Sequence, residues 1–288
     1  MAFTHPSPQG PPLGFVLADA PIDIDALFAA LSDELPGGVS RHPIQTGDGA
    51  PAGEMLAVDA QGVTLLLAPV ASPVPDEAAL HAAHPVWWPE TSAVRDHTHH
   101  VVITVARPQG AEIDHDAALH EAVMFSVIAT IVLEQPQAVG LFYGSGGITL
   151  PAGPYRQMVT DALEAGRLPV EAWVTAWLTK HEDRFSGRTV GLDAFGHAEL
   201  SVEDSAHEAS EVYGLLISLA AHLISTGDRL QPGASVGPSA DERYDGLAAA
   251  SGEEALRLPA ERHPDVVILA LGLPGLDGVD VVRGLRGG

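Results

Sequence analysis

The segment from Asp114 to Leu133 most constrains the fold, because its apolar residues cover most sides of a predicted helix. Such a helix is stable only where neighbouring elements bury it on several sides. The β-branched run at 101–106 precedes it and is typical of a central strand. Together, the two segments predict a core in which this helix packs on a sheet.

Shorter segments predict how that sheet is built. The runs 54–58 and 63–68 flank Ala60-Gln61-Gly62, a pattern that favours a hairpin. Further strands are predicted at 13–17, 138–143, 170–178, 188–192, 198–202 and 233–237, and helices behind the N-cap Asp23, over 154–165 and, capped by Glu203-Asp204-Ser205, over 206–225. Hairpins mixed with helices indicate an α+β fold with a mixed, mainly antiparallel sheet and packed helices.

Composition divides the chain of 288 residues into three parts. Residues 1–12 are rich in Pro and Gly and are expected to be flexible. Residues 13–245 form the predicted main α+β domain, and 246–288 form a short tail, expected to be a β-α appendage. With 46% hydrophobic residues, the main part can bury a substantial core.

The charge of the chain excludes some classes of partner. Thirty-eight acidic residues against fourteen basic ones give a formal net charge of -24, and the acids are spread along the chain. Binding to nucleic acid or to an anionic membrane surface depends on Lys and Arg, so neither is expected. A protein partner with a basic or apolar surface fits this charge better.

The absence of cysteine excludes disulfides, thiolate catalysis and Cys-ligated metal sites. The first twelve residues lack the basic end and apolar stretch of a signal peptide. The apolar stretch around Ala122 to Leu133 is too short to span a bilayer. A cytoplasmic location is therefore expected.

The cluster His97, His99 and His100 is the most direct candidate for chemistry. On a strand, His97 and His99 would share a face and His100 would point away. Two imidazoles could hold a divalent metal ion if an acid such as Glu199 joined them. The alternative is that these histidines are polar residues at a strand end, paired with ordinary partners.

Other motifs point more weakly to function. Gly144-Ser145-Gly146-Gly147 lacks the lysine of a P-loop and the frame of a nucleophile elbow, so a tight loop is expected. Arg188, Asp193 and Glu199 could form a polar cluster, although Gly191 and Gly196 favour turns there. Trp87 and Trp88, next to a proline, could anchor a protein partner if they are exposed.

Two parts of the chain resemble known families. The run from Thr189 to Leu200, TVGLDAFGHAEL, followed by a long helix and by Gly233-Ala-Ser-Val-Gly237, is similar to the C-terminal signature of an uncharacterised bacterial family, domain of unknown function 4261. With the upstream Trp-Trp-Pro, the histidine-rich strand and Trp173, the resemblance extends over about residues 13–245. It implies a shape but no activity and no catalytic residues.

The tail resembles the middle of a response-regulator receiver domain. The resemblance rests on Ser251-Gly-Glu-Glu-Ala-Leu256, on Pro264-Asp265 with the apolar run 266–271, and on Leu273-Pro-Gly-Leu-Asp-Gly278. In that family an aspartate after the apolar strand accepts phosphate, and here that position is Ala270. A methyl group has no oxygen that could attack phosphorus, so phosphotransfer is not expected.

Three functions follow as expectations. The first is a bacterial accessory or protein-interaction protein without catalytic activity and without a cofactor. The second is a metal-dependent hydrolase that uses His97 and His99 with a distant acid such as Glu199. The third is a degenerate phosphorelay protein with a receiver fragment that cannot be phosphorylated. No complete catalytic constellation occurs in the sequence, which favours the first.

Overall fold

The chain forms two compact units, residues 10–173 and residues 174–288 with the first nine residues. The computed structural model describes residues 8, 10–45, 51–75, 78–82, 92–108, 110–228, 246–247 and 266–267. The predicted main domain, 13–245, therefore spans both units. The predicted flexible start, 1–12, and the predicted tail, 246–288, fall mostly outside the described residues, so their boundaries stay predictions.

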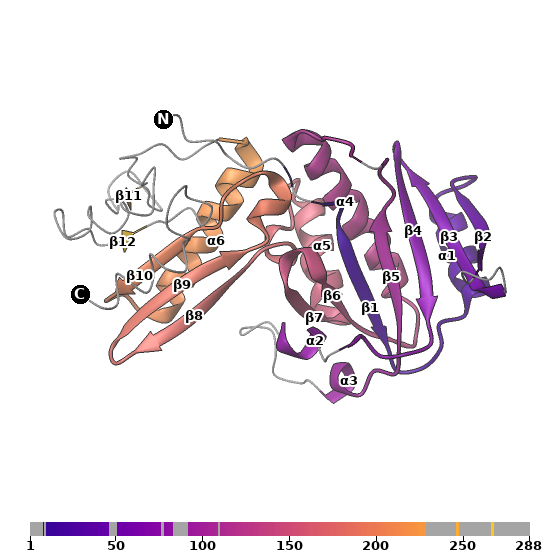
Figure 1. Cartoon of the computed structure of the whole chain (residues 1–288), viewed down its shortest axis with the longest axis horizontal. Coiled ribbons are helices and arrows are strands. Elements are labelled where there is room, and N and C mark those ends of the chain that lie inside the picture. The colour runs from indigo at the N-terminus through magenta and orange to yellow at the C-terminus, as the bar shows by residue number, and fades with distance from the viewer. Residues whose placement is uncertain are drawn as a thin grey trace. The chain divides into compact units, whose positions relative to one another are not determined.

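The first unit contains a seven-stranded sheet (Figure 1). Its strands are β1 (Leu13–Ala18), β2 (Val39–Gln45), β3 (Pro51–Ala60), β4 (Val63–Val70), β5 (His99–Val105), β6 (Ala138–Tyr143) and β7 (Ile148–Pro151). The spatial order is β2-β3-β4-β5-β1-β6-β7, and all neighbours are antiparallel. β5 is the fourth of seven strands, which confirms the predicted central strand at 101–106.

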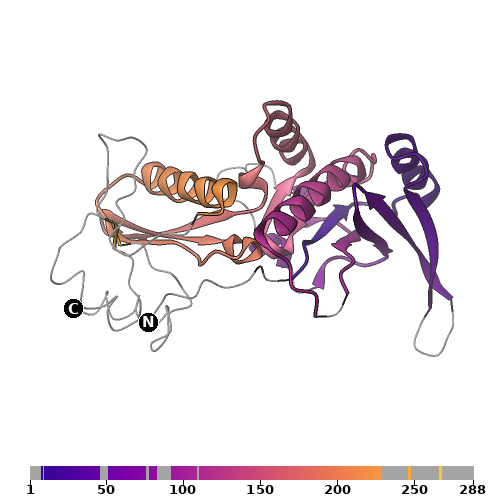
Figure 2. The same cartoon turned by 90° about the horizontal axis from the view of Figure 1, so that it is seen from above.

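Helices cover one face of this sheet, as Figure 2 shows. They are α1 (Ile24–Glu34), α4 (His115–Val132) and α5 (Ala152–Glu164). Phe125 of α4 is fully buried, and its ring lies 5.2 Å from that of Tyr143 on β6. On the other face, the short helices α2 (Ala78–His81) and α3 (Ser92–Arg95) place Ala79 and Val94 against Leu17.

Local signals set several of these boundaries as the sequence predicts. The carboxylate of Asp23 accepts hydrogen bonds from the backbone N–H groups of Asp25 and Ala26, and so caps α1. Asp114 caps α4 in the same way. Gln61 and Gly62 have φ angles of 51° and 87°, the left-handed values that a two-residue hairpin turn requires between β3 and β4.

The second unit is a three-stranded antiparallel sheet with one long helix. Its elements are β8 (Thr175–His181), β9 (Arg184–Val190), β10 (Ser201–Ser205) and α6 (Ala209–Thr226), in the strand order β10-β9-β8. α6 packs on the sheet at Gly187, where an added Cβ atom would meet Val212 and Leu216. The described part of the tail is a parallel pair, β11 (Gly246–Leu247) and β12 (Val266–Val267).

Some predicted boundaries in this region are wrong. Residues 170–172 form a 3-10 turn instead of a strand, and β10 begins three residues later than predicted. α6 begins at Ala209, and its cap is Glu208 with Glu211, not 203–205. The predicted edge strand at 233–237 lies outside the described residues.

The observed architecture confirms the predicted α+β class with a mainly antiparallel sheet. Within the described residues, α4 and α6 are each 18 residues long and apolar enough to cross a membrane by length and composition. Both helices pack on sheets, as core helices of soluble domains do, and their apolar windows are 50% and 39% buried.

Candidate functional site

His97 is held by two backbone groups. It precedes β5, so the alternation of side chains along a strand does not apply to it, and the predicted shared face with His99 is wrong. Its Nδ1 lies 2.6 Å from the carbonyl oxygen of Val94, and its Nε2 accepts the N–H of Val74 at 3.0 Å. Because Nε2 accepts, Nδ1 is the nitrogen that donates to Val94, and neither nitrogen has a lone pair left for a metal ion.

The two other histidines of the cluster also have partners. The Nδ1 of His100 lies 2.7 Å from the carbonyl oxygen of Ser72. Burial lowers the pKa of His100, and its neighbours His97 and His99 lower it further, against the opposing effect of the bond to Ser72. The Nδ1 of His99 lies 2.8 Å from the hydroxyl of Thr98. His97 and His100 together fix residues 72–74 against the start of β5.

A metal site on His97, His99 and Glu199 stays a prediction. The two histidines belong to the first unit and Glu199 to the second. Within the described residues, no group of three or more potential ligands lies close enough to hold an ion. The lone pair of His97 Nε2 is already used by Val74, so a metal ion would have to break that hydrogen bond.

We expect His97→Phe to lower the free energy of unfolding by about 2–3 kcal/mol, because the buried Val74 N–H and Val94 carbonyl would lose their partner. His99→Phe is the matched control, since the ring of His99 is half-buried and its Nδ1 contacts the hydroxyl of the neighbouring residue, not a buried backbone group. Chemical denaturation measures the free energy of unfolding of both variants. Equal losses for the two variants would contradict the structural role of His97.

Glu199 anchors the loop between β9 and β10. One carboxylate oxygen accepts the Thr189 hydroxyl at 2.6 Å, and the other accepts the N–H groups of Gly191 and Leu192 at 2.8 and 2.9 Å. Gly191 and Gly196 have φ angles of 112° and 78°, so both mark turns, as predicted. This part of the candidate polar cluster therefore stabilises the backbone of a loop.

Burial raises the pKa of Glu199, and nearby Asp193 adds to this, while the hydrogen bonds from Thr189 and Gly191 oppose it. A raised pKa means that the folded chain holds this proton more tightly than the unfolded chain. The contribution to stability is thus fully present below the ordinary pKa of 4.5 and is lost as the pH rises through the raised value.

We therefore expect wild type to lose stability relative to Glu199→Gln as the pH rises from about 4 towards neutrality, because glutamine carries no charge to desolvate. Unfolding free energies of the two proteins, measured in parallel across this range, give the difference directly. Asp33→Asn, at an exposed site on α1, is the control and should give no such trend. Parallel curves for wild type and Glu199→Gln would contradict the prediction.

The glycine-rich loop 144–147 is a turn between two strands. It joins β6 to β7, whereas the sequence placed it before a helix, where backbone N–H groups can bind phosphate. The hydroxyl of Ser145 accepts the backbone N–H of Leu13 at 2.9 Å, so it ties the start of β1 to this turn. An added Cβ atom at Gly146 would lie 2.1 Å from the carbonyl oxygen of Trp173. The tight loop is confirmed.

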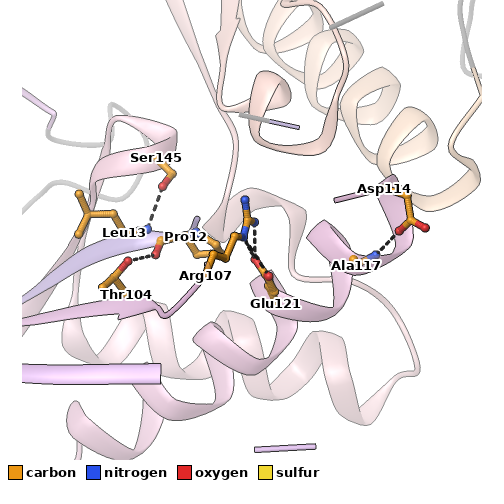
Figure 3. A network of polar contacts seen from close by, with 8 residues as sticks. All are labelled: Pro12, Leu13, Thr104, Arg107, Asp114, Ala117, Glu121 and Ser145. Carbon is orange, nitrogen blue, oxygen red and sulfur yellow. Dashed lines mark hydrogen bonds and ion pairs between the residues drawn. The ribbon is translucent and has the colours of Figure 1, made fainter. Parts of the chain in front are cut away.

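A buried ion pair that the sequence does not predict joins Arg107 and Glu121. Arg107, just after β5, donates from Nε to both carboxylate oxygens of Glu121 on α4, at 3.0 and 2.9 Å, and its Nη2 donates to one of them. Each side chain is only 11% exposed. Figure 3 shows the pair beside the contacts of Leu13 with Ser145 and of Pro12 with Thr104. An acid directly before the apolar part of the helix was the one signal available in the sequence.

Three predicted residues lie outside the described part of the chain. They are Trp87 and Trp88, expected to bind a partner, and Ala270, at the position of the receiver phosphoacceptor. The described candidates thus divide into two structural groups: the histidines that hold 72–74 and the Glu199 loop. In both groups, most of the polar atoms bind neighbouring backbone, and the others bind threonine hydroxyls.

Comparison with known families supports the second unit as the recognisable part. A family model described as "Domain of unknown function (DUF4261)" matches residues 188–247. The match begins in β9 and contains the Glu199 loop, β10 and α6. This confirms, for 188–247, the resemblance to domain of unknown function 4261 that the sequence indicates.

Curated relatives match the chain over a short segment. The chain is 57% identical over 44 residues to the transcriptional regulatory protein KdpE of Mycobacterium tuberculosis, covering 15% of this chain and 20% of the relative. It is 50% identical over 38 residues to the transcriptional regulatory protein AfsQ1 of Streptomyces coelicolor, covering 13% and 17%. The chain thus spans about a fifth of the length of these relatives. The matches confirm the resemblance to a response-regulator fragment, and no solved structure matches the chain.

Proposed function

We propose that the chain is a bacterial cytoplasmic accessory protein that binds a basic protein partner through its acidic surface and catalyses no reaction itself. The observation that carries the proposal is the net charge of -24, which comes from acids spread along the whole chain. A surface of this sign attracts basic partners and repels nucleic acid and anionic membranes.

Several arginines of the described residues are already paired with acids. Four arginines are each bound to at least one acid, in the pairs Arg41 with Asp25 and Glu54, Arg107 with Glu121, Arg156 with Glu134, and Arg184 with Asp204. Their positive charge is therefore locally compensated. Other acids of the first unit are exposed: Asp19, Asp33, Glu34, Asp96, Glu112, Asp161 and Glu164.

The contacts of the candidate reactive groups support a non-catalytic role. His97 is fixed by Val94 and Val74, Ser145 accepts from Leu13, and Glu199 accepts from three donors of its own loop. A catalytic nucleophile needs a neighbouring base within hydrogen-bond reach, and the partners of Ser145 and Glu199 are instead backbone groups and a threonine. These residues serve as structural links.

Affinity capture from a lysate of the source bacterium tests the binding proposal. We expect the full chain to retain a basic protein at low salt and to release it at about 0.5 M salt, where charges are screened beyond a few ångström. A variant with Asp33→Asn, Glu34→Gln, Asp161→Asn and Glu164→Gln should retain less, with its fold unchanged by circular dichroism. Failure to capture a specific partner, or capture indifferent to salt and to these changes, would refute the proposal.

Metal analysis separates this proposal from the alternative of a metal-dependent hydrolase on His97 and His99. We expect protein purified without an affinity tag to contain far less than one equivalent of zinc or manganese, since the His97 lone pair is engaged by Val74. Added zinc should leave the melting temperature unchanged. A stoichiometric metal ion that is lost in His99→Ala would favour the hydrolase.

A further inference from the structure

β10 is an edge strand, yet three of its side chains are buried. It stands at the end of the order β10-β9-β8, and strand edges ordinarily face solvent. Yet Ser201, Val202 and Ser205 are 1%, 0% and 0% exposed. Val202 lies opposite Gly187, which contacts α6, so α6 accounts for its burial. Ser201 lies on the opposite face of the sheet, and α6 does not account for its burial.

The backbone of Ser201 is directed to the free edge. The carbonyl of Leu200 accepts the N–H of Thr189 on β9 at 2.9 Å. In an antiparallel pair, successive residues direct their backbone groups alternately towards and away from the partner strand. The N–H and carbonyl of Ser201 therefore point away from β9, and its buried hydroxyl has no hydrogen-bond partner among the described residues. These backbone groups of Ser201 could pair with a further strand at the free edge of β10.

Among the described residues, β12 of the receiver-like tail lies near β10, in a separate two-stranded sheet. β12 contacts β10, and both strands belong to the second unit. β12 also pairs in parallel with β11, with Val266 opposite Gly246 and Val267 opposite Leu247. In the sequence, β12 begins the apolar run 266–271, and a run of this kind is typical of strands that are buried on both faces.

We propose that the receiver-like tail is an intramolecular docking strand that occupies the free edge of β10. The tail lacks the acceptor aspartate, replaced by Ala270, but a strand needs only its backbone and apolar side chains to dock on an edge. This role goes beyond the acidic-surface proposal and does not depend on it. It makes β10 a strand-binding site that the chain fills itself.

Engineered disulfides test the placement in the full chain, because the protein contains no cysteine of its own. Under mild oxidation, Ser201→Cys with Val266→Cys should form an intramolecular cross-link at least about ten times faster than Thr179→Cys with Val266→Cys, since a disulfide needs Cα atoms within about 7 Å. Thr179 lies on β8, the opposite edge of the same sheet. Similar rates for both pairs, cross-links between molecules, or no cross-link at all would overturn the proposal.

Hydrogen exchange tests whether the tail docks at β10 without introducing cysteines. In the full chain carrying Val266→Asp and Val267→Asp, amides of residues 201–205 should exchange at least about tenfold faster than in wild type, because the edge is opened. Residues 184–190, in the middle of the sheet, serve as the internal reference. Unchanged exchange in 201–205, or equal acceleration in both segments, would contradict docking at β10 even if the cysteine variants failed to fold.

Discussion

Glu121→Leu is expected to lower the free energy of unfolding by about 3–5 kcal/mol, because it leaves the Arg107 guanidinium buried without its carboxylate. Both side chains are 11% exposed, so water can compensate the orphaned charge only slightly. The three hydrogen bonds from Arg107 to this carboxylate are lost at the same time. Chemical denaturation followed by tryptophan fluorescence measures the loss.

The double variant Arg107→Met with Glu121→Leu removes both charges and should recover most of that loss, to within about 1 kcal/mol of wild type. Arg156→Met is the surface control. Arg156 and its partner Glu134 are 42% and 55% exposed, and such pairs contribute up to about 1 kcal/mol. A double variant as unstable as Glu121→Leu would show that the site depends on the polar groups themselves and would contradict this account.

The sequence could not predict this pair, because no local rule connects its members. Arg107 follows a strand, and Glu121 lies fourteen residues later on a mostly apolar helix. Helical spacing links residues three or four apart, and strand alternation links every second residue, so neither relates these two positions. Only the packing of α4 on the sheet brings them together.

Elements with local signals were predicted well. Asp23 and Asp114 mark helix starts through their own side chains, and Gln61-Gly62 adopts the turn that its hairpin needs. By contrast, β2 was missed because it is an edge strand: Ser40, Arg41, His42 and Pro43 are exposed, so it has no apolar alternation. β7 was missed because it has four residues and runs directly into α5.

The division into two units has no signature in the sequence. It falls between Trp173 and Val174, inside the apolar segment 170–178, and both residues are fully buried. Domain boundaries are usually sought in polar, Pro- or Gly-rich linkers, and this boundary has none. For the same reason, the sequence grouped His97, His99 and Glu199 into one candidate site although they belong to different units.

Trp173 is the residue next to this boundary whose loss should matter most. It is fully buried, and its Nε1 donates to the Ser126 hydroxyl at 2.8 Å. Its carbonyl oxygen occupies the space that a side chain at Gly146 would need. Trp173→Ala should therefore lower the free energy of unfolding by about 3–5 kcal/mol, because a large cavity opens between α4 and the turn at 144–147.

Trp173→Phe distinguishes the effect of the lost hydrogen bond to Ser126 from the effect of the lost side-chain volume. It keeps most of the packing but leaves the Trp173 bond to Ser126 unmade, so a smaller loss of about 1–2 kcal/mol is expected. Ser126 retains its own bond to the Ala122 carbonyl at 2.9 Å, which limits the cost. Trp177→Ala, at a half-buried tryptophan on β8, serves as the control and should cost less than Trp173→Ala. If the two alanine variants lost equal stability, the residue at 173 would have no special part in joining α4 to this turn.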